Sequence, residues 1–316
     1  MVSNWFNTEK KSHRLATWVV TLFFPHVELY KHPQKIPKIM KPTSESEYTS
    51  SYLALQPPDD KLIDSWVEQF HREGFLFIPN VLPPEWCSEL RRDLDRVLDE
   101  SKTPEDKKRP SRHTLELFHR MFETSEANLR LFDLEPIVTF AERLVAPNCH
   151  VIHNNSFRTP HGTGISGWHQ DDPPHLEVTH GEPPDNIRLP VLLFTCNYYL
   201  TDVDEVAHGP TQTVPRSHLF GAGPPDSIEG SAHEGRVVSN LGPAGSVIMF
   251  NNQVWHRGAP NTSDRTRYIT QISYARRVIG HKYFPFMNYQ MPEHVFSSAD
   301  ERRKRLLGFL PRGAYG

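Results

Sequence analysis

Two short stretches of the sequence carry residues that could bind a metal ion. Residues 167–172 contain His169 and Asp171, and residues 254–258 contain His256. Side chains two positions apart on a β-strand point to the same face, so a strand through the first stretch would present an imidazole and a carboxylate side by side. A histidine from a second, distant strand would complete a set of two histidines and one carboxylate. That set leaves coordination positions open, which suits non-haem Fe(II) and oxygen chemistry.

Asp172 and His175 are nearby alternatives as ligands. On a strand, Asp172 would point to the face opposite His169, so Asp171 is the predicted carboxylate ligand. His175 belongs to the loop that follows, and we interpret it as an ordinary loop histidine. The predicted metal ligands are therefore His169, Asp171 and His256.

Arg267 follows His256 by eleven residues, after a turn-like stretch at 260–264. It opens a strand-like run that would pair back beside the strand carrying His256. A guanidinium is a planar fork that binds a carboxylate through two hydrogen bonds. An arginine in this place could hold the far carboxylate of a dicarboxylate whose other end chelates the metal.

Two further segments complete a resemblance to a known family. The chain resembles the phytanoyl-CoA dioxygenase family of Fe(II)/2-oxoglutarate oxygenases in its entry segment, residues 70–82 (FHREGFLFIPNVL), and in its central segment, residues 208–218 (HGPTQTVPRSH). We interpret His218, the last residue of the central segment, as structural. The resemblance covers roughly residues 60–285 and rests on four motifs in the same order and spacing. It implies an enzyme that binds Fe(II), takes 2-oxoglutarate as co-substrate and reacts with O2.

The resemblance also implies roles for individual residues. Fe(II) would bind the three predicted ligands, and Arg267 would hold the C5 carboxylate of 2-oxoglutarate. The strand-like run 151–159 faces the co-substrate in this family, and a second run at 190–200 could also meet it. Further candidate co-substrate contacts on these two runs are His153, Asn155, Thr195 and Asn197.

Two positions bear on the reaction type. In related iron halogenases the position of Asp171 holds Ala or Gly, so a carboxylate here favours hydroxylation or another oxidation. Several family members carry Ser or Thr two residues after the second histidine, where this chain has Gly258. The glycine removes one hydroxyl from the predicted co-substrate pocket.

The hydrophobic periodicity changes near residue 150. Before it, apolar residues recur mainly at helical spacing, and after it the pattern becomes strand-like with many turns. Helices are predicted at 59–73, 83–100 and 136–145, and strands at 75–78, 151–159, 190–200, 211–214, 246–250 and 269–275. This order predicts a mainly β fold with flanking α-helices, in which eight antiparallel strands form a double-stranded β-helix (jelly roll, cupin-like). Such a barrel holds its ligand site inside one mouth.

Three regions are expected along the chain: an N-terminal helix and extended arm at 1–58, the dioxygenase domain at 59–291, and a C-terminal helix and tail packed on that domain at 292–316. The apolar run at 15–24 is too short to span a bilayer. We interpret the basic run at 302–305 as a solvated helix face, and the insertion at 173–189 as a lid over the substrate.

Composition limits the classes of partner. The chain has 316 residues and a net charge of −3, which gives no electrostatic reason to expect nucleic acid or stable membrane insertion. Its three cysteines are widely spaced, which favours a reducing compartment and a cytoplasmic protein. The expected partners are a small-molecule substrate and O2, and self-association into a homo-oligomer stays open.

The predicted reaction is hydroxylation, or another oxidation, of an unactivated C–H bond in a small metabolite, secondary metabolites included, with release of succinate and CO2. An acyl-CoA 2-hydroxylase of the phytanoyl-CoA type is the alternative that the family implies. A non-catalytic, metal-binding cupin-like protein and a zinc-dependent hydrolase with the same ligands belong to other classes. Dependence on added 2-oxoglutarate separates an oxygenase from both of these.

Overall fold

The computed structural model describes residues 52–57, 59–101, 115–180, 186–282 and 289–309. These residues belong to one compact unit, Ser50–Gly316. The predicted N-terminal helix and most of the predicted arm lie outside the described residues. The last part of the arm forms a short 3-10 helix, Leu53–Leu55, whose backbone donates hydrogen bonds to the carbonyls of Asn80 and Val81.

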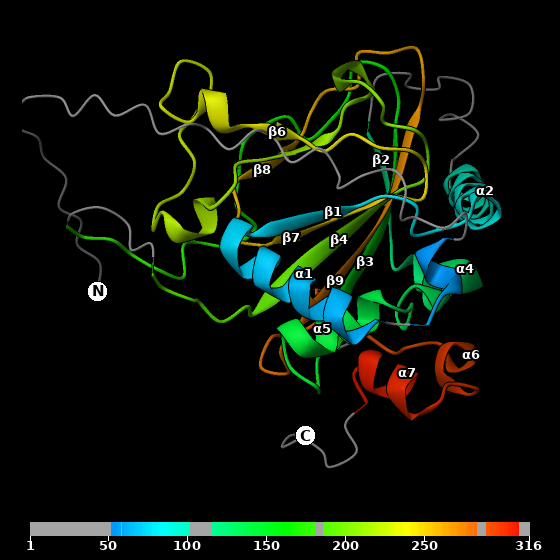
Figure 1. Ribbon diagram of the computed structural model, residues 1–316. Coiled ribbons are helices and arrows are strands. Elements are labelled where there is room, and N and C mark those ends of the chain that lie inside the picture. Colours follow the sequence, from blue (N-terminus) through cyan, green and yellow to red (C-terminus); the bar gives the residue numbers. More distant parts are fainter. Residues whose placement is uncertain (1–51, 58, 102–114, 181–185, 283–288, 310–316) are drawn as a thin grey trace, which may run out of the picture. The chain divides into compact units, whose positions relative to one another are not determined.

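A six-stranded antiparallel sheet forms the centre of the unit (Figure 1). Its strands, in spatial order, are β1 (Phe75–Ile78), β7 (Val247–Asn251), β4 (Leu193–Tyr199), β9 (Arg267–Ala275), β3 (His150–Thr159) and β2 (Glu116–His119). Alternate residues of β4 separate its two faces: Phe194, Cys196 and Tyr198 join the main hydrophobic core, whereas Tyr199 joins a second apolar cluster on the other face. Thr195 and Asn197 share the face of Tyr199 because side chains alternate along a strand.

A smaller sheet of three short strands completes the β structure. Its order is β6 (Val238–Ser239), β5 (Thr211–Thr213) and β8 (His256–Gly258). The predicted mainly β jelly roll is confirmed. The described residues hold nine strands: β1 and β2 precede residue 150 and form the edges of the larger sheet, and seven follow. Seven follow where eight were predicted for the jelly roll, because the chain at His169 forms only an isolated bridge.

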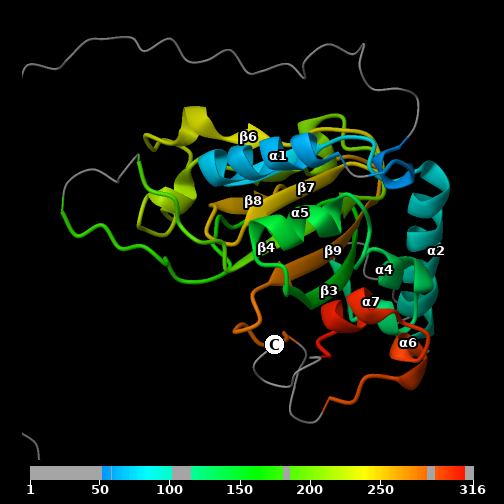
Figure 2. The ribbon, with the colours of Figure 1, turned by 60° about the horizontal axis from the view of Figure 1, so that its bottom comes forward.

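Helices cover one face of the larger sheet (Figure 2). The helices are α1 (Asp60–Glu73), α2 (Pro84–Glu100), α4 (Glu126–Arg130), α5 (Ile137–Leu144), α6 (Glu293–Phe296) and α7 (Glu301–Leu306). Phe70 of α1 and Phe140 of α5 pack edge-on against each other and against Phe194 of β4, with ring centroids 5.5–5.7 Å apart. The carboxylate of Asp59 caps α1, and Gly74 ends it at a φ of 83° that only glycine adopts without strain. The three predicted helices are confirmed.

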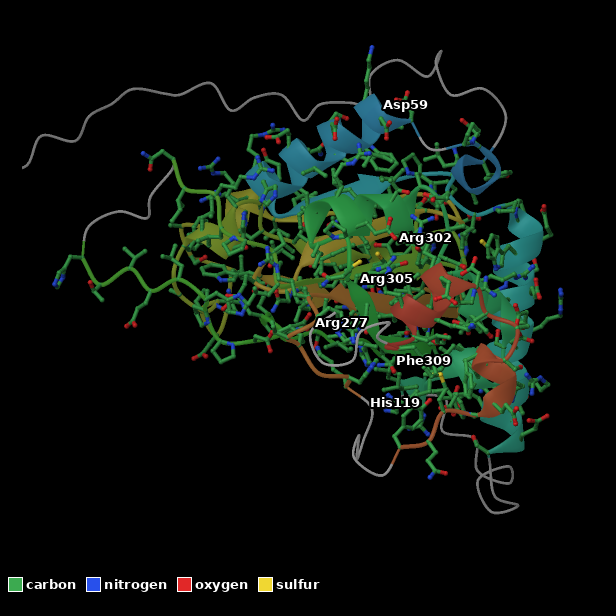
Figure 3. All side chains as sticks on the ribbon, turned by 90° about the horizontal axis from the view of Figure 1, so that it is seen from below. Asp59, His119, Arg277, Arg302, Arg305 and Phe309 are labelled. Carbon is green, nitrogen blue, oxygen red and sulfur yellow. The ribbon has the colours of Figure 1, made fainter. Side chains whose placement is uncertain are left out.

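The C-terminal helices pack on this unit through ion pairs. Arg302 of α7 bonds to Glu135 and Glu142, Arg303 bonds to Asp133, and Arg305 bonds to Glu142; Figure 3 labels Arg302 and Arg305. The interpretation of the basic run as a solvated helix face is therefore wrong. The hydrophobic pattern of α7 could not reveal that acids from a distant segment face it. No helix among the described residues is long and apolar enough to cross a membrane.

Candidate metal centre

His169, Asp171 and His256 meet at the mouth of the barrel. Each offers one ligand atom, and the three atoms lie within 4.8 Å of one another. Nε2 of His256 is 3.7 Å from Oδ1 of Asp171, and the two imidazole rings have centroids 4.3 Å apart. His256 is buried, His169 is half-buried and Asp171 is exposed. The structure therefore brings together all three predicted ligands, with an open side towards solvent.

The local backbone around His169 and Asp171 differs from the prediction. His256 lies on β8, but His169 makes only an isolated β-bridge to it, in which each backbone N–H donates to the other residue's carbonyl over 3.0 Å. The predicted strand through 169–171 is wrong. The chain continues into Pro173 and Pro174, which have no N–H to extend a ladder.

Both imidazoles are oriented for metal binding. Nδ1 of His169 donates to the carbonyl of Gly167, and Nδ1 of His256 donates to the carbonyl of Val254, both over 2.8 Å. This arrangement places the ring proton on Nδ1 and leaves the lone pair of Nε2 available for a metal. Burial lowers the pKa of His256 to about 4, so this ring is neutral at neutral pH. The donor set fits a divalent transition metal with open positions.

The carboxylate of Asp172 is bonded to the loop between β7 and β8. Its Oδ2 accepts a hydrogen bond from Nδ2 of Asn252. Asp171, in contrast, is held through its backbone N–H, which donates to the carbonyl of Asn252 over 3.0 Å and leaves the carboxylate free. The choice of Asp171 over Asp172 agrees with this geometry.

Arg267 is buried on β9, and Nε and Nη1 of its guanidinium have no hydrogen-bond partner among the described residues. Burial lowers its pKa to about 10. A side chain added at Gly258 would begin 3.5 Å from Nη2, so the guanidinium lies beside β8, two residues beyond His256. Burying a charge without a partner is costly. The arrangement fits a site built for an anion that reaches from the metal centre.

His153 and Asn155 form a chain of hydrogen bonds with a residue that the sequence did not single out. Nδ1 of His119 donates to Oδ1 of Asn155 over 2.8 Å, and Nδ2 of Asn155 donates to Nε2 of His153 over 2.6 Å. His119, labelled in Figure 3, is the last residue of β2 and pairs in register with Asn155 of β3. Burial lowers the pKa of His153 to about 4, while the charge of Asp171 acts to raise it. The four residues of β2, Glu116–His119, have no apolar–polar alternation, so the sequence carried little signal for this strand.

Thr195 and Asn197 are buried on the inner face of β4 and are bonded to β9. Oγ1 of Thr195 lies 2.9 Å from Oγ of Ser273, and Oδ1 of Asn197 accepts from Nε2 of Gln271 over 3.0 Å. Each therefore already has a partner across the sheet. Gln271 lies between Asn155 and Asn197 in register, so a polar row crosses the inner face of the sheet.

The segment predicted to be a lid is described at 173–180 and from 186 onwards. Beside it lies a cavity of about 190 Å³, lined in part by His175, Leu189 and His218. Nε2 of His218 donates to the carbonyl of His71 over 3.1 Å, which ties the segment after β5 to α1. This contact agrees with a structural interpretation of His218.

A family model described as Phytanoyl-CoA dioxygenase (PhyH) matches residues 70–269. The match covers more than half of the chain. The chain belongs to this family, and its class of enzyme is a dioxygenase. The predicted family and enzyme class are confirmed.

Two curated relatives, both named ectoine dioxygenase, are similar to this chain at low sequence identity. An ectoine dioxygenase of Nocardia farcinica (strain IFM 10152) is 25% identical over 223 residues, which cover 61% of this chain and 70% of the relative. An ectoine dioxygenase of Bordetella parapertussis (strain 12822) is 23% identical over 258 residues, which cover 70% of this chain and 80% of the relative.

Solved structures share the fold. The epimerase SnoN, in complex with Fe3+, alpha ketoglutarate and nogalamycin RO, superposes with a TM-score of 0.53 at 18% identity, over 77% of this chain and 93% of SnoN. HygX from Streptomyces hygroscopicus, with nickel and 2-oxoglutarate bound, superposes with a TM-score of 0.52 at 16% identity, over 68% of this chain and 88% of HygX.

Proposed function

We propose that this dioxygenase uses Fe(II) and 2-oxoglutarate to oxidise an unactivated C–H bond of a small metabolite. The observation that carries the proposal is Arg267, a buried cation with unpartnered donors on the same side of β8 as His256. Two residues along a strand span about 7 Å, which suits a short dicarboxylate between the metal and the guanidinium. A zinc-dependent hydrolase would have no use for a buried cation in this place.

The roles of the residues follow from their donors. His169, Asp171 and His256 would hold the iron, and Arg267 would bind the C5 carboxylate of 2-oxoglutarate through two charge-assisted hydrogen bonds. With O2, the bound iron and co-substrate supply the oxidant for the C–H bond and release succinate and CO2. Hydrogen bonds from the guanidinium nitrogens of Arg267 to this carboxylate would reduce the free-energy cost of burying the charge.

Apolar side chains line the interior near Arg267. Tyr199, Ile248, Phe250 and Ile269 form one buried cluster, and the ring of Phe250 packs 4.3 Å from that of His256. An apolar wall excludes water, and a low local dielectric strengthens the attraction between a guanidinium and a carboxylate. These apolar residues therefore favour binding of a charged co-substrate only where Arg267 neutralises its carboxylate.

His153 would donate a hydrogen bond to an oxygen of the co-substrate or the substrate. The bond from Asn155 occupies Nε2 of His153, so its ring proton lies on Nδ1 and remains available to a ligand. Asn155, fixed by His119, would keep His153 in this tautomer. Thr195 and Asn197 would contribute through the second lone pair or donor that their sheet contacts leave.

The substrate class rests on the named relatives. Ectoine dioxygenases and an epimerase from nogalamycin biosynthesis suggest a small metabolite, secondary metabolites included. Epimerisation or desaturation would use the same ligands. An acyl-CoA 2-hydroxylase is the alternative that the family name suggests. A non-catalytic metal-binding protein would leave the buried Arg267 unexplained.

We also propose the domain limits 1–58, 59–291 and 292–316, a cytoplasmic location and self-association into a homo-oligomer. The cytoplasmic location is supported by three buried cysteines with free thiols, Cys87, Cys149 and Cys196. Burial raises the pKa of Cys87 and Cys149 to about 11, which keeps these thiols protonated and unreactive.

The test is an anaerobic titration of metal-free protein with Fe(II) and then 2-oxoglutarate, which should produce the visible charge-transfer band of the chelate. Arg267→Gln should weaken the band by raising the 2-oxoglutarate concentration needed to form it. Arg276→Gln is the matched control, because Arg276 follows the other end of β9 and also has a buried Nε without a partner among the described residues. Absence of the band in the unmodified protein, with zinc bound instead, would overturn the proposal.

A further inference from the structure

Two of the three predicted ligands come from a segment that is neither strand nor helix. Residues 170–175 follow the single bridge at His169 and make no ladder hydrogen bonds. The segment is joined instead to the loop between β7 and β8, which leads to His256. The contacts between this loop and the segment therefore decide where Asp171 lies relative to His256.

Asn252 provides the first contact. Its side chain is fully buried, and its Nδ2 donates to the carboxylate of Asp172, the residue after the ligand. Its backbone carbonyl accepts from the N–H of Asp171 over 3.0 Å. Asp171 is thus held between two bonds to Asn252, one through its own backbone and one through its neighbour's side chain.

Gln253 provides the second contact and uses both ends of its amide. Nε2 donates to the carbonyl of Asp172 over 3.3 Å and to the carbonyl of Pro173 over 3.1 Å, while Oε1 accepts from the N–H of His175 over 2.7 Å. The carbonyl of Gln253 also accepts from Nε2 of Gln170 over 2.6 Å. Gln253 is 4% exposed, and its four bonds are partly buried.

The two prolines explain why side chains are needed here. Pro173 and Pro174 offer no N–H, so a neighbouring strand could not pair with this segment in a regular ladder. Carbonyls near a buried surface still require donors, because an unmet acceptor costs about 1–3 kcal/mol. The amide of Gln253 supplies those donors from outside the segment.

We propose that Asn252 and Gln253 are positioning residues that hold Asp171 against His256, so that the metal site is formed before the metal binds. The inference rests on the proposed metal site. Residues that orient ligands typically change metal affinity by about 10–100-fold when they are removed. Asp172, which sequence alone presents as a competing ligand, becomes part of the support for Asp171.

The experiment exchanges the two partners of the side-chain bond. Asn252→Asp places two carboxylates against each other and should weaken Co(II) or Fe(II) affinity by about 10–100-fold. Asp172→Asn keeps an acceptor for Asn252 and should weaken affinity by only a few-fold. The double variant Asn252→Asp with Asp172→Asn restores a bond of reversed direction and should recover about tenfold of the loss.

A second pair of variants covers the case in which Asn252→Asp does not fold. Gln253→Leu should weaken metal affinity by about tenfold. Gln212→Leu is the matched control, because Gln212 is also buried and doubly bonded, to Ser239 and Arg257, but makes no bond to residues 170–175. The Co(II) absorption spectrum should broaden in Gln253→Leu and remain unchanged in Gln212→Leu. The unfolding temperature of the metal-free protein, in contrast, should fall by a similar amount in both variants.

Four outcomes would overturn the inference, three of which concern affinities that fail to differ. These three are wild-type affinity in Asn252→Asp, a double variant that binds no better than Asn252→Asp, and equal metal affinities for Gln253→Leu and Gln212→Leu. Loss of all binding in Asp172→Asn alone would also overturn it, by making Asp172 a ligand. Failure of the metal site itself would appear differently, as unchanged metal binding in His256→Ala.

Discussion

The two ends of the proposed co-substrate site are built in different ways. At the metal end, His169 and Asp171 come from a segment with one β-bridge, and Asp171 is exposed. At the arginine end, Arg267 is buried at the start of β9, which pairs along its length with β3 and β4. One end is assembled by side-chain contacts between loops, and the other is fixed by backbone ladders.

The difference matches what each end has to do. A ladder holds Arg267 rigidly, which suits a contact that binds the same carboxylate in every turnover. The metal end must admit a substrate and O2, so it cannot be closed by a continuous sheet. The proposed ligand Asp171 is exposed and lies outside the ladders, and the contacts of Asn252 and Gln253 support the segment that carries it.

The largest expected effect is on metal affinity, from a substitution at the metal end. His256→Ala removes the buried ligand and should reduce metal affinity by more than ~100-fold, because loss of even a supporting residue costs about 10–100-fold. Isothermal titration with Co(II) or anaerobic Fe(II) measures the change. His218→Ala is the control, since His218 is similarly buried but bonds to a backbone carbonyl, that of His71. Retained tight binding in His256→Ala would contradict the ligand set.

Arg267→Met should have opposite effects on binding and on stability. Loss of the charge-assisted bonds, worth about 1.5–3 kcal/mol, should raise the dissociation constant of 2-oxoglutarate by about 10–150-fold, with metal affinity unchanged. The metal-free and co-substrate-free protein should unfold at a higher temperature, because a buried cation without a partner has been removed. A lower unfolding temperature would indicate a partner for Arg267 within the protein.

Acid should reduce the free energy of unfolding through two buried histidines, His153 and His218, and not through Arg267. Burial lowers the pKa of both His153 and His218 to about 4, from the ordinary histidine value of 6.5. The folded state therefore favours the neutral ring, and the contribution to stability is complete above pH 6.5 and is lost as the pH falls towards 4.

Between pH 7 and pH 5, His153→Gln and His218→Gln should each reduce the acid-induced loss of unfolding free energy by about 2 kcal/mol. Arg267→Met should leave that loss unchanged. Urea unfolding in the presence of a chelator measures the difference without metal binding. Equal pH dependence in all three variants would show that folding does not lower the pKa of these histidines.

The smallest expected effect is a gain at the arginine end. A Cβ at Gly258 would lie 3.5 Å from Nη2 of Arg267 and 3.6 Å from the backbone nitrogen of Ile165, which are ordinary contacts. Gly258→Ser should therefore fit and add one hydroxyl near the carboxylate. An added hydrogen bond of about 0.5–1.5 kcal/mol predicts 2–12-fold tighter 2-oxoglutarate binding. Gly258→Ala is the control, and tightening by Ala as well would exclude the hydroxyl as the cause.

Several features of the fold followed from the sequence because their causes are local. Helical spacing and the glycine at 74 predicted α1 within one residue, and the structure adds Asp59 as its cap. Period-two alternation predicted β3 and the inner face of β4. The strand at 116–119 was missed, because four residues at a sheet edge carry too little pattern to stand out from a loop.

The sequence by itself determined the ligand types, their order and the arginine that follows, because metal chemistry depends on side-chain identity and coarse spacing. The tertiary structure decided how those residues are held. A single bridge replaced the expected strand at His169, distant acids paired with the basic run of α7, and His119 joined Asn155 across a sheet edge. These contacts join residues far apart in the chain, so no local pattern encodes them.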